Sequence, residues 1–143
     1  MLQRQYGKRG WNLAGDVAYL DNDGHLIYKA RADQMITNSG YTISPTEVGR
    51  TLLRHPTVVE CSVVDQPDDR GGTLTSTHIV LRAGIYASEA LTAQLQLHVK
   101  SRIAPYNCPG KVMYHADDLP RNASRRIWCV ALRCRENKAG SAA

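Results

Sequence analysis

The clearest helix start in the chain is the stretch Ser44-Pro45-Thr46-Glu47. Ser44 can cap the first turn, Pro45 suits the first helical position, and Glu47 can reach back to complete a capping box. The helix should stop before Pro56, because the residue preceding a proline avoids the helical region. Within these limits, apolar residues recur on one helical face: Val48, Leu52 and Leu53.

Two strands and a second helix should follow. Residues 58–64 form a β-branched run and residues 78–81 an apolar one, with a turn-rich stretch between them. Ser88 can cap the second helix, and Pro105 ends it. The residues that recur at helical intervals in this segment should cover the sheet: Leu91, Leu95, His98, Val99 and Ile103.

The C-terminal end carries weaker structural signals and the net charge. Residues 111–114 predict a short strand and residues 127–132 a final helical segment. Residues 134–143 are polar or small, and we expect them to be disordered. Basic and acidic residues are equal in number up to Pro120, so the net charge of +5 comes from the residues that follow. A neutral body with a basic end disfavours a nucleic-acid-binding surface.

The N-terminal part predicts a β-hairpin and a connector. Apolar runs at 17–20 and 26–28 flank Asp21-Asn22-Asp23-Gly24, a composition that favours a tight reversal. The polar stretch Thr37-Asn38-Ser39-Gly40 is typical of a connector into a second unit. We place the boundary between the two units near Asp33.

These elements together predict an α+β fold. Residues 1–33 hold the β-hairpin and a hinge, and residues 34–133 form a small mixed sheet covered by two to three helices. The four cysteines include no C-x-x-C pair, and no histidine pair has zinc-finger spacing, which disfavours a metal site. No run approaches the ~18 apolar residues of a membrane span. We therefore expect a cytoplasmic protein with reduced thiols.

Several segments resemble, in the same order, the C-terminal portion of acyl-CoA synthetases. These enzymes belong to the AMP-forming adenylating family, which also includes luciferases and nonribosomal peptide adenylation domains. The sequence around Gly10-Trp11-Asn12 and Cys61 is most similar to benzoate- and aminobenzoate-CoA ligases. The segments that carry the resemblance are Gly10-Trp11-Asn12-Leu13-Ala14-Gly15-Asp16, Ala30-Arg31-Ala32-Asp33-Gln34-Met35-Ile36, Ser39-Gly40-Tyr41-Thr42-Ile43-Ser44-Pro45-Thr46-Glu47-Val48, and the stretch 104–121.

The resemblance implies a two-step reaction. A carboxylate attacks ATP to give acyl-AMP and pyrophosphate, and the thiol of coenzyme A then displaces AMP. In this family a large N-terminal domain binds ATP and the acid and makes most of the contacts to the phosphates. We expect that this chain does not contain that domain. Residues 1–33 resemble the end of the adenylating core, with its β-hairpin and hinge, and residues 34–133 resemble the mobile lid that follows.

Three residues near the hairpin match nucleotide-binding and hinge positions of the family. Asp16 matches the aspartate that accepts hydrogen bonds from both ribose hydroxyls of AMP, a role that suits two carboxylate oxygens. Arg31 matches an arginine that reaches the ribose or phosphate through several planar donors. Asp33 matches the residue about which the lid rotates. Residue type alone equally allows a turn aspartate, a solvated arginine and a plain connector, and the series of motifs favours the functional interpretation.

Further residues match positions that contact coenzyme A. Gly40 matches the loop that lines the pantetheine tunnel, where glycine permits close backbone approach. Tyr106 matches an aromatic position near the adenine of coenzyme A, and Lys111 is the nearby basic residue. The structural alternatives are an ordinary turn glycine, a core tyrosine and a surface lysine.

The main departure from the family pattern lies in Pro120-Arg121-Asn122-Ala123-Ser124-Arg125-Arg126-Ile127. Family members carry a lysine here, preceded by a glycine, and that lysine reaches the forming acyl-phosphate. Arg126 falls on the lysine position and Arg125 on the glycine position. Arginine replaces a compact ammonium with a wide planar fork, and Arg125 adds a side chain to the loop. We expect weak adenylation, whereas the thioester step does not use the lysine.

Two functional hypotheses follow. The first is the lid of an AMP-forming acyl-CoA ligase, in particular an aryl-CoA ligase, inactive alone and dependent on a separate N-terminal adenylation domain. The second is a non-catalytic module that retains nucleotide or coenzyme A binding, or that binds a partner. The resemblance implies ATP or AMP, coenzyme A and a small carboxylate as substrates, with Mg²⁺ accompanying ATP in the full enzyme. We expect the isolated chain to bind none of these tightly, and we expect no nucleic-acid or membrane partner.

Overall fold

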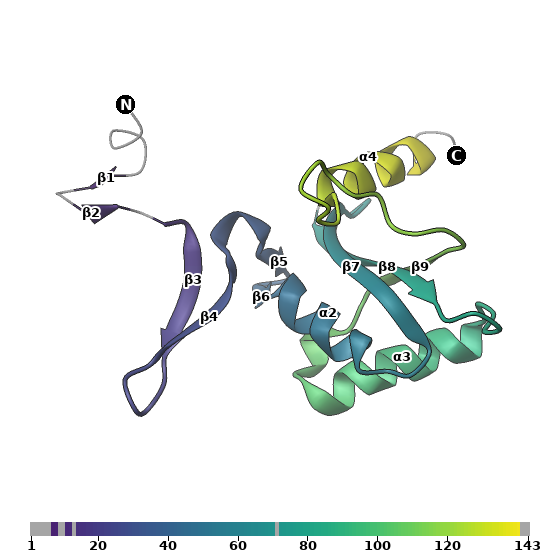
Figure 1. The fold of residues 1–143 in the computed structure, drawn as a ribbon, viewed down its shortest axis with the longest axis horizontal. Helices are drawn as coiled ribbons and strands as arrows, with labels where there is room; N and C mark the ends of the chain where they lie inside the picture. Colours follow the sequence, from purple (N-terminus) through teal and green to yellow (C-terminus); the bar gives the residue numbers. More distant parts are fainter. Residues whose placement is uncertain (1–6, 9–10, 13, 71, 141–143) are drawn as a thin grey trace.

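The computed structural model describes residues 7–8, 11–12, 14–70 and 72–140. Figure 1 shows two parts: the described residues up to 33, which we call the hairpin arm, and the compact part from residue 34 onward, which we call the lid. Within the described residues the fold is α+β, as the sequence predicts, with short sheets and three α-helices. Gly10 and Leu13 of the first resembling segment lie outside the described residues, as do residues 141–143 of the predicted tail.

The hairpin arm contains two antiparallel strand pairs. Strands β1 (Gly7–Lys8) and β2 (Trp11–Asn12) form the first pair, and β3 (Asp16–Leu20) and β4 (Leu26–Arg31) form the second. The predicted hairpin is confirmed, and Gly24 has the positive φ of 85° that its turn requires.

A third short hairpin replaces the predicted connector. A 3-10 turn at Ala32–Gln34 leads into β5 (Ile36–Asn38), which pairs with β6 (Tyr41–Ile43). Ser39 and Gly40 form the reversal at φ values of 49° and 84°. A two-residue loop with positive φ at both positions matches the right-handed twist of the strands it joins.

The lid is built on a mixed three-stranded sheet. Strand β7 (Val58–Pro67) pairs antiparallel with β8 (Thr73–Leu81), and β8 pairs in parallel with β9 (Lys111–His115). The parallel connection from β8 to β9 carries α3 (Glu89–Arg102), because parallel neighbours require a long crossover. Strand β8 begins five residues before the predicted 78–81, in a segment whose side chains are polar but buried: Thr75, Ser76 and Thr77.

Both predicted helix starts are confirmed. Helix α2 (Pro45–Leu53) begins after Ser44, whose Oγ accepts the N–H of Glu47 at 3.4 Å. Helix α3 begins after Ser88, whose Oγ accepts the N–H of Leu91 at 3.1 Å. In each case a side-chain oxygen satisfies an N–H that the first helical turn leaves without a partner.

Two apolar clusters cover the two faces of the sheet. The larger one joins β5–β6, α2 and α3 to one face and is centred on Ile36, Ile43, Val48, Leu52, Ile79, Leu95 and Val99. The smaller one joins α4 (Cys129–Gly140) to the other face through Val64, Val80, Leu119 and Leu132. Figure 1 shows the sheet between α3 and α4. None of the described helices combines the length and apolarity needed to cross a membrane.

Helix α4 corrects the expectation for the C-terminal end. The prediction of a disordered tail from Cys134 onward is wrong up to Gly140, because α4 continues to that residue. The predicted helical segment 127–132 also starts later, at Cys129. Leu132 is fully buried and fixes the helix against β7. This tertiary contact, rather than local propensity, accounts for the helix.

A tight turn precedes α4. The N–H of Arg125 donates to Asn122 O at 2.9 Å, and an isolated bridge pairs Arg121 with Ile127. Arg125 then adopts a left-handed conformation with φ of 60°. This arrangement, a turn followed by one left-handed residue, is a common way to close a short antiparallel loop, and glycine is the residue that fits it without strain.

Replacing Leu132 with alanine should lower the free energy of unfolding by about 2–5 kcal/mol, because a fully buried leucine leaves a cavity. Urea denaturation measures this change. Val130→Ala, at a position 53% exposed on the same helix, is the matched control and should change stability by less than about 0.5 kcal/mol. Equal effects of the two variants would show that α4 does not pack on the sheet through Leu132.

Replacing Arg125 with glycine should raise the free energy of unfolding by up to about 1 kcal/mol. Relief of a left-handed non-glycine residue, roughly 1–2 kcal/mol, outweighs the added flexibility of the unfolded chain, about 0.4–1 kcal/mol. Ala123→Gly in the same turn is the control and should be destabilising, because Ala123 has no positive φ to relieve. A loss of stability in Arg125→Gly would contradict this account.

Candidate functional site

Asp16, Arg31 and Asp33 meet where the hairpin joins the lid. Asp16 and Arg31 are direct partners on β3 and β4, and the Arg31 Nη1 donates to Asp16 Oδ1 at 3.3 Å and to Ala14 O at 2.9 Å. The Arg31 Nε lies 3.5 Å from Asp33 Oδ1. The structure thus brings together the two predicted nucleotide-binding residues and the predicted hinge residue.

Gly15 is required for this arrangement. It has a φ of 73°, and a Cβ placed on it would lie 3.2 Å from the Arg31 Nη2. The guanidinium therefore packs against the backbone just before Asp16. All three charged side chains are at least 40% exposed, so water screens their ion pairs, which add little to stability. Exposed groups held in a fixed arrangement can bind a ligand with hydroxyl or phosphate oxygens.

Gly40 and Tyr106 belong to a second group of residues. Gly40 forms the open turn between β5 and β6, and no atom lies within 4 Å of where its Cβ would be. Tyr41 follows the turn and stacks on Tyr106, with ring centroids 4.6 Å apart and an interplanar angle of 12°. Both rings are about half exposed. Lys111 begins β9, and no hydrogen bond or ion pair joins it to either tyrosine among the described residues.

The sequence places Tyr41 with Gly40 in the loop that resembles the lining of the pantetheine tunnel, but it does not predict that Tyr41 stacks on Tyr106. Tyr106 lies 65 positions away, and only the fold brings the two rings together. An exposed stacked pair offers a flat apolar surface of the kind on which a planar ring can pack.

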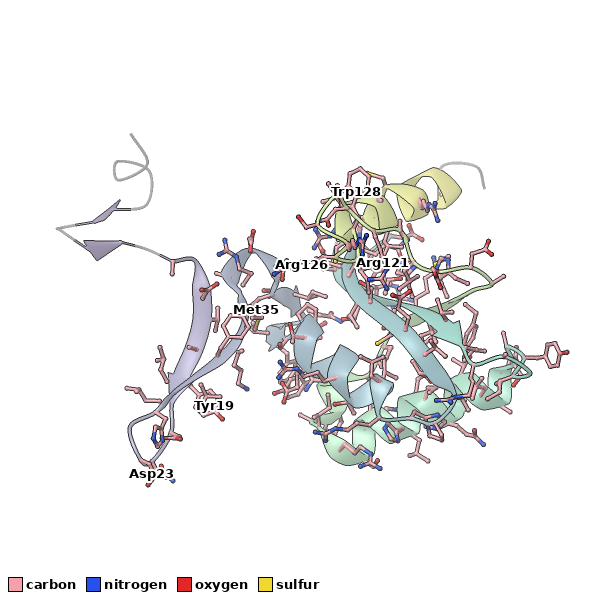
Figure 2. All side chains as sticks on the ribbon, in the orientation of Figure 1. Tyr19, Asp23, Met35, Arg121, Arg126 and Trp128 are labelled. Carbon is pink, nitrogen blue, oxygen red and sulfur yellow. The ribbon has the colours of Figure 1, made fainter. Side chains whose placement is uncertain are left out.

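Arg126 lies on the turn before α4. Its N–H donates to Asn122 Oδ1 at 3.0 Å, and its carbonyl accepts the N–H of Asn122 at 2.8 Å. Its side chain is exposed. Figure 2 shows Arg121, Arg126 and Trp128 gathered beside α4. Arg126 therefore presents an exposed cation on a backbone that is held by hydrogen bonds.

The Gly40–Tyr106 group and the turn that carries Arg126 belong to opposite sides of the sheet. The hairpin that carries Gly40 is part of the cluster with α2 and α3, through Ile36 and Ile43. The turn that carries Arg126 is flanked by Leu119 and Ile127, which belong to the cluster with α4. A single small domain therefore presents one candidate surface on each face.

A cavity of about 270 Å³ separates the hairpin arm from helix α2. Lys29 of β4 faces Glu47 of α2 across it at 4.0 Å. Arg50 and Arg54 also line the cavity, so its charged lining residues are three bases and one acid, beside aromatic and apolar side chains. The cavity leaves the arm and α2 incompletely packed against each other, and a loosely packed contact of this kind permits movement between units.

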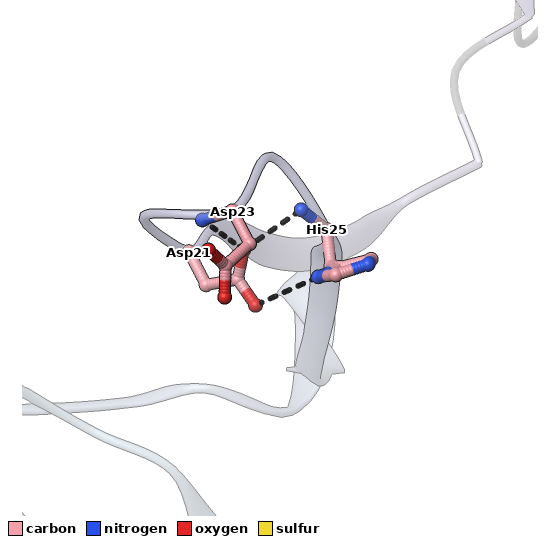
Figure 3. A group of neighbouring side chains, drawn as sticks. All are labelled: Asp21, Asp23 and His25. Carbon is pink, nitrogen blue, oxygen red and sulfur yellow. Dashed lines mark hydrogen bonds and ion pairs between the residues drawn. The ribbon is translucent and has the colours of Figure 1, made fainter.

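Asp21, Asp23 and His25 form the one group of three metal-type ligands found among the described residues (Figure 3). Asp21 Oδ1 accepts the N–H groups of Asp23 and His25 at 3.0 and 2.8 Å, and Asp21 Oδ2 lies 3.3 Å from His25 Nδ1. These bonds close the β3–β4 turn, so the cluster is accounted for by the turn itself.

Cys61 is not an activated nucleophile. Burial, with the charge of Glu60 as a smaller cause, raises the pKa of the Cys61 thiol to about 12. Its Sγ lies 3.2 Å from the carbonyl of Gly49. A neutral, buried thiol is unreactive, and Cys61 packs in the larger apolar cluster as a core residue.

Comparisons with known proteins agree with this architecture. The family model described as the AMP-binding enzyme C-terminal domain matches residues 47–126. The chain is 40% identical over 126 residues to an uncharacterized acyl-CoA ligase, YtcI, of Bacillus subtilis, covering 88% of this chain and 24% of the ligase. It is 42% identical over 131 residues to the mitochondrial acyl-coenzyme A synthetase ACSM4 of Rattus norvegicus, covering 90% of this chain and 22% of the synthetase.

Solved structures give the same result. The anthranilate CoA ligase AuaEII in complex with anthranoyl-AMP superposes with a TM-score of 0.84 at 32% identity, covering 96% of this chain and 27% of the ligase. The o-succinylbenzoate CoA synthetase MenE of Bacillus subtilis superposes with a TM-score of 0.79 at 33% identity, covering 91% and 26%. The chain spans about a quarter of the length of the relatives it matches. It belongs to the family of AMP-binding enzyme C-terminal domains and is a homologue of the corresponding part of acyl-CoA synthetases.

Proposed function

We propose that this chain is the mobile lid of an AMP-forming acyl-CoA ligase and acts only together with an adenylating domain, supplied in cis or in trans. The observation that carries the proposal is the presence of two candidate surfaces on opposite faces of one sheet. A lid that turns about Asp33 would present the Arg126 face for adenylation and the Gly40 face for thioester formation. Such a rotation needs only a few backbone dihedral changes.

The hairpin arm supports the existence of the partner domain. Apolar residues along both of its strands are exposed: Tyr19, Leu20, Leu26, Ile27 and Tyr28. Leu20 and Leu26 are 68% and 73% exposed and lie opposite each other on paired strands. Tyr19 and Ile27 lie on the opposite face, where they line the cavity beside α2, so the surface that Leu20 and Leu26 present is turned away from the lid. An exposed apolar surface of this kind marks an interaction surface. We propose that the adenylating domain covers it.

The proposed roles of the site residues follow from their chemistry. Asp16 and Arg31 would bind the ribose or phosphate of AMP, because they offer acceptors and donors in a fixed pair. Gly40, Tyr106 and Lys111 would contact coenzyme A, with Tyr41 supporting the Tyr106 ring. Arg126 would approach the acyl-phosphate. The adenylating domain would hold Mg²⁺ with ATP.

We further propose an aryl acid as substrate and a cytoplasmic location. The aryl proposal is supported by the structural relatives that act on anthranilate and o-succinylbenzoate, whereas another relative is a 4-hydroxybutyrate-CoA ligase. The acid pocket itself would belong to the adenylating domain. All four cysteines are free thiols, which suits a reducing compartment.

The test is reconstitution with the adenylating domain of a related ligase, either fused or mixed. ATP–pyrophosphate exchange reports adenylation, and thioester formation from preformed acyl-AMP reports the second step. We expect Arg125→Gly/Arg126→Lys to raise ATP–pyrophosphate exchange on the order of 10²–10³-fold. The lysine would supply a compact hydrogen-bond donor to the negative charge that develops in the transition state. Thioester formation should change little.

Arg135→Lys, at an exposed position of α4, is the matched control and should alter neither rate. If the double variant gives no gain in exchange over the control, Arg126 does not occupy the proposed position. If no pairing with an adenylating domain yields thioester above the level of either piece, the proposed function is wrong.

In the reconstituted enzyme, Asp16→Asn should reduce ATP–pyrophosphate exchange about tenfold or more, because the nucleotide loses a charged hydrogen-bond acceptor on the protein. Stability should change by less than about 1 kcal/mol, since Asp16 makes only an exposed ion pair. Asp23→Asn at the hairpin tip is the control and should leave exchange unchanged. Equal losses in the two variants would argue against a specific role for Asp16.

A further inference from the structure

Glu60 ties strand β7 to the turn that carries Arg126. Its Oε2 accepts the N–H of Leu119 at 3.0 Å, and its Oε1 accepts a hydrogen bond from the Arg121 Nη2. The Glu60 side chain is only 12% exposed. Both carboxylate oxygens are therefore engaged with the start of one loop; the carboxylate is largely shielded from water, whereas the Arg121 side chain is 48% exposed.

A β-bulge directs Glu60 toward that loop. Val58 pairs with Leu81 and Glu60 pairs with Val80, so Val59 is an extra residue in β7. Val58, Cys61 and Val63 all pack on the side of α2 and α3, whereas Val64 packs with α4. Side chains alternate along a regular strand, so without the bulge Glu60 would share the face of Val58 and point into the larger core. The bulge reverses this and aims the carboxylate at the loop.

The connection continues from Arg121 to Arg126. The Arg121 Nη1 donates to the carbonyl of Arg125 at 2.9 Å. Asn122 Oδ1 accepts the N–H groups of Ser124 and Arg126, each at 3.0 Å. The backbone on both sides of the Arg125–Arg126 peptide bond is thus restrained by hydrogen bonds, and through Arg121 that restraint leads back to the Glu60 carboxylate, which is only 12% exposed.

We infer that Glu60 is a positioning residue: it holds the 119–127 loop on β7 and so sets where Arg126 lies for the adenylation step. The second half of this inference rests on the proposed function, and the first half does not. Arg133 and Asp65 provide an internal comparison, because they form another ion pair between β7 and the C-terminal segment without contacting the loop.

The first experiment is amide hydrogen exchange on the intact chain. Glu60→Ala should speed exchange at Leu119 and at the turn amides of Asn122, Arg125 and Arg126 by about tenfold or more, because charged hydrogen bonds are lost. Glu60→Gln keeps an acceptor for Leu119 and should give a smaller increase. Asp65→Asn is the matched control and should leave these amides unchanged.

If Glu60→Ala does not fold, Arg121→Gln tests the same connection from the exposed end of the pair and should speed exchange at Arg125 and Arg126. Loop exchange in the Glu60 or Arg121 variants no faster than in Asp65→Asn would overturn the inference. This readout is independent of ligase activity.

The second experiment uses the reconstituted enzyme carrying Arg125→Gly/Arg126→Lys. Adding Glu60→Gln should lower ATP–pyrophosphate exchange about tenfold, as the loss of one charged interaction, and leave thioester formation from preformed acyl-AMP unchanged. A general loss of structure would lower both rates together, and that result would also overturn the positioning role. If the parent enzyme has no activity, the proposed function fails while hydrogen exchange still decides whether Glu60 holds the loop.

Discussion

Strand β7 is buried on both faces, and the rest of the lid depends on that double burial. Cys61 and Val63 contribute to the cluster with α2 and α3, and Val64 to the cluster with α4. One strand therefore joins two cores, and the bulge at Val59 decides which side chains enter each. The two candidate surfaces are fixed relative to one another because both are attached to this sheet, the β5–β6 hairpin through β8 and the α4 segment through β7.

The sequence predicts most of the fold where local chemistry and packing agree. Ser44 and Ser88 cap helices as expected, and Asp21 and Gly24 shape the first hairpin. Prediction fails where tertiary contacts dominate. Residues 75–77 are polar but buried in β8, and the C-terminal helix has little periodicity and depends on Leu132. The β5–β6 hairpin was missed because strands of three residues give no readable alternation.

The candidate site divides in the same way. Residue type and motif context identify Asp16, Arg31 and Asp33, and strand register brings them together. The stacking of Tyr41 on Tyr106 and the contact of Glu60 with Arg121 could not be predicted from sequence, because an aromatic after a turn and an acid in a strand are both ordinary. These contacts join residues that lie 65 and 61 positions apart, respectively. Contacts at such separations exist only in the folded chain, so sequence patterns within a short window do not contain them.

The exposed leucines on the β3–β4 hairpin affect how long the protein persists in a cell. Chaperones and proteases recognise proteins by exposed hydrophobic segments. Leu20 and Leu26 form such a segment on the hairpin arm, which projects from the lid (Figure 1). A copy in which nothing covers these side chains would be retained, degraded or driven into self-association. Its abundance would then depend on burial of this surface, which makes assembly a form of quality control.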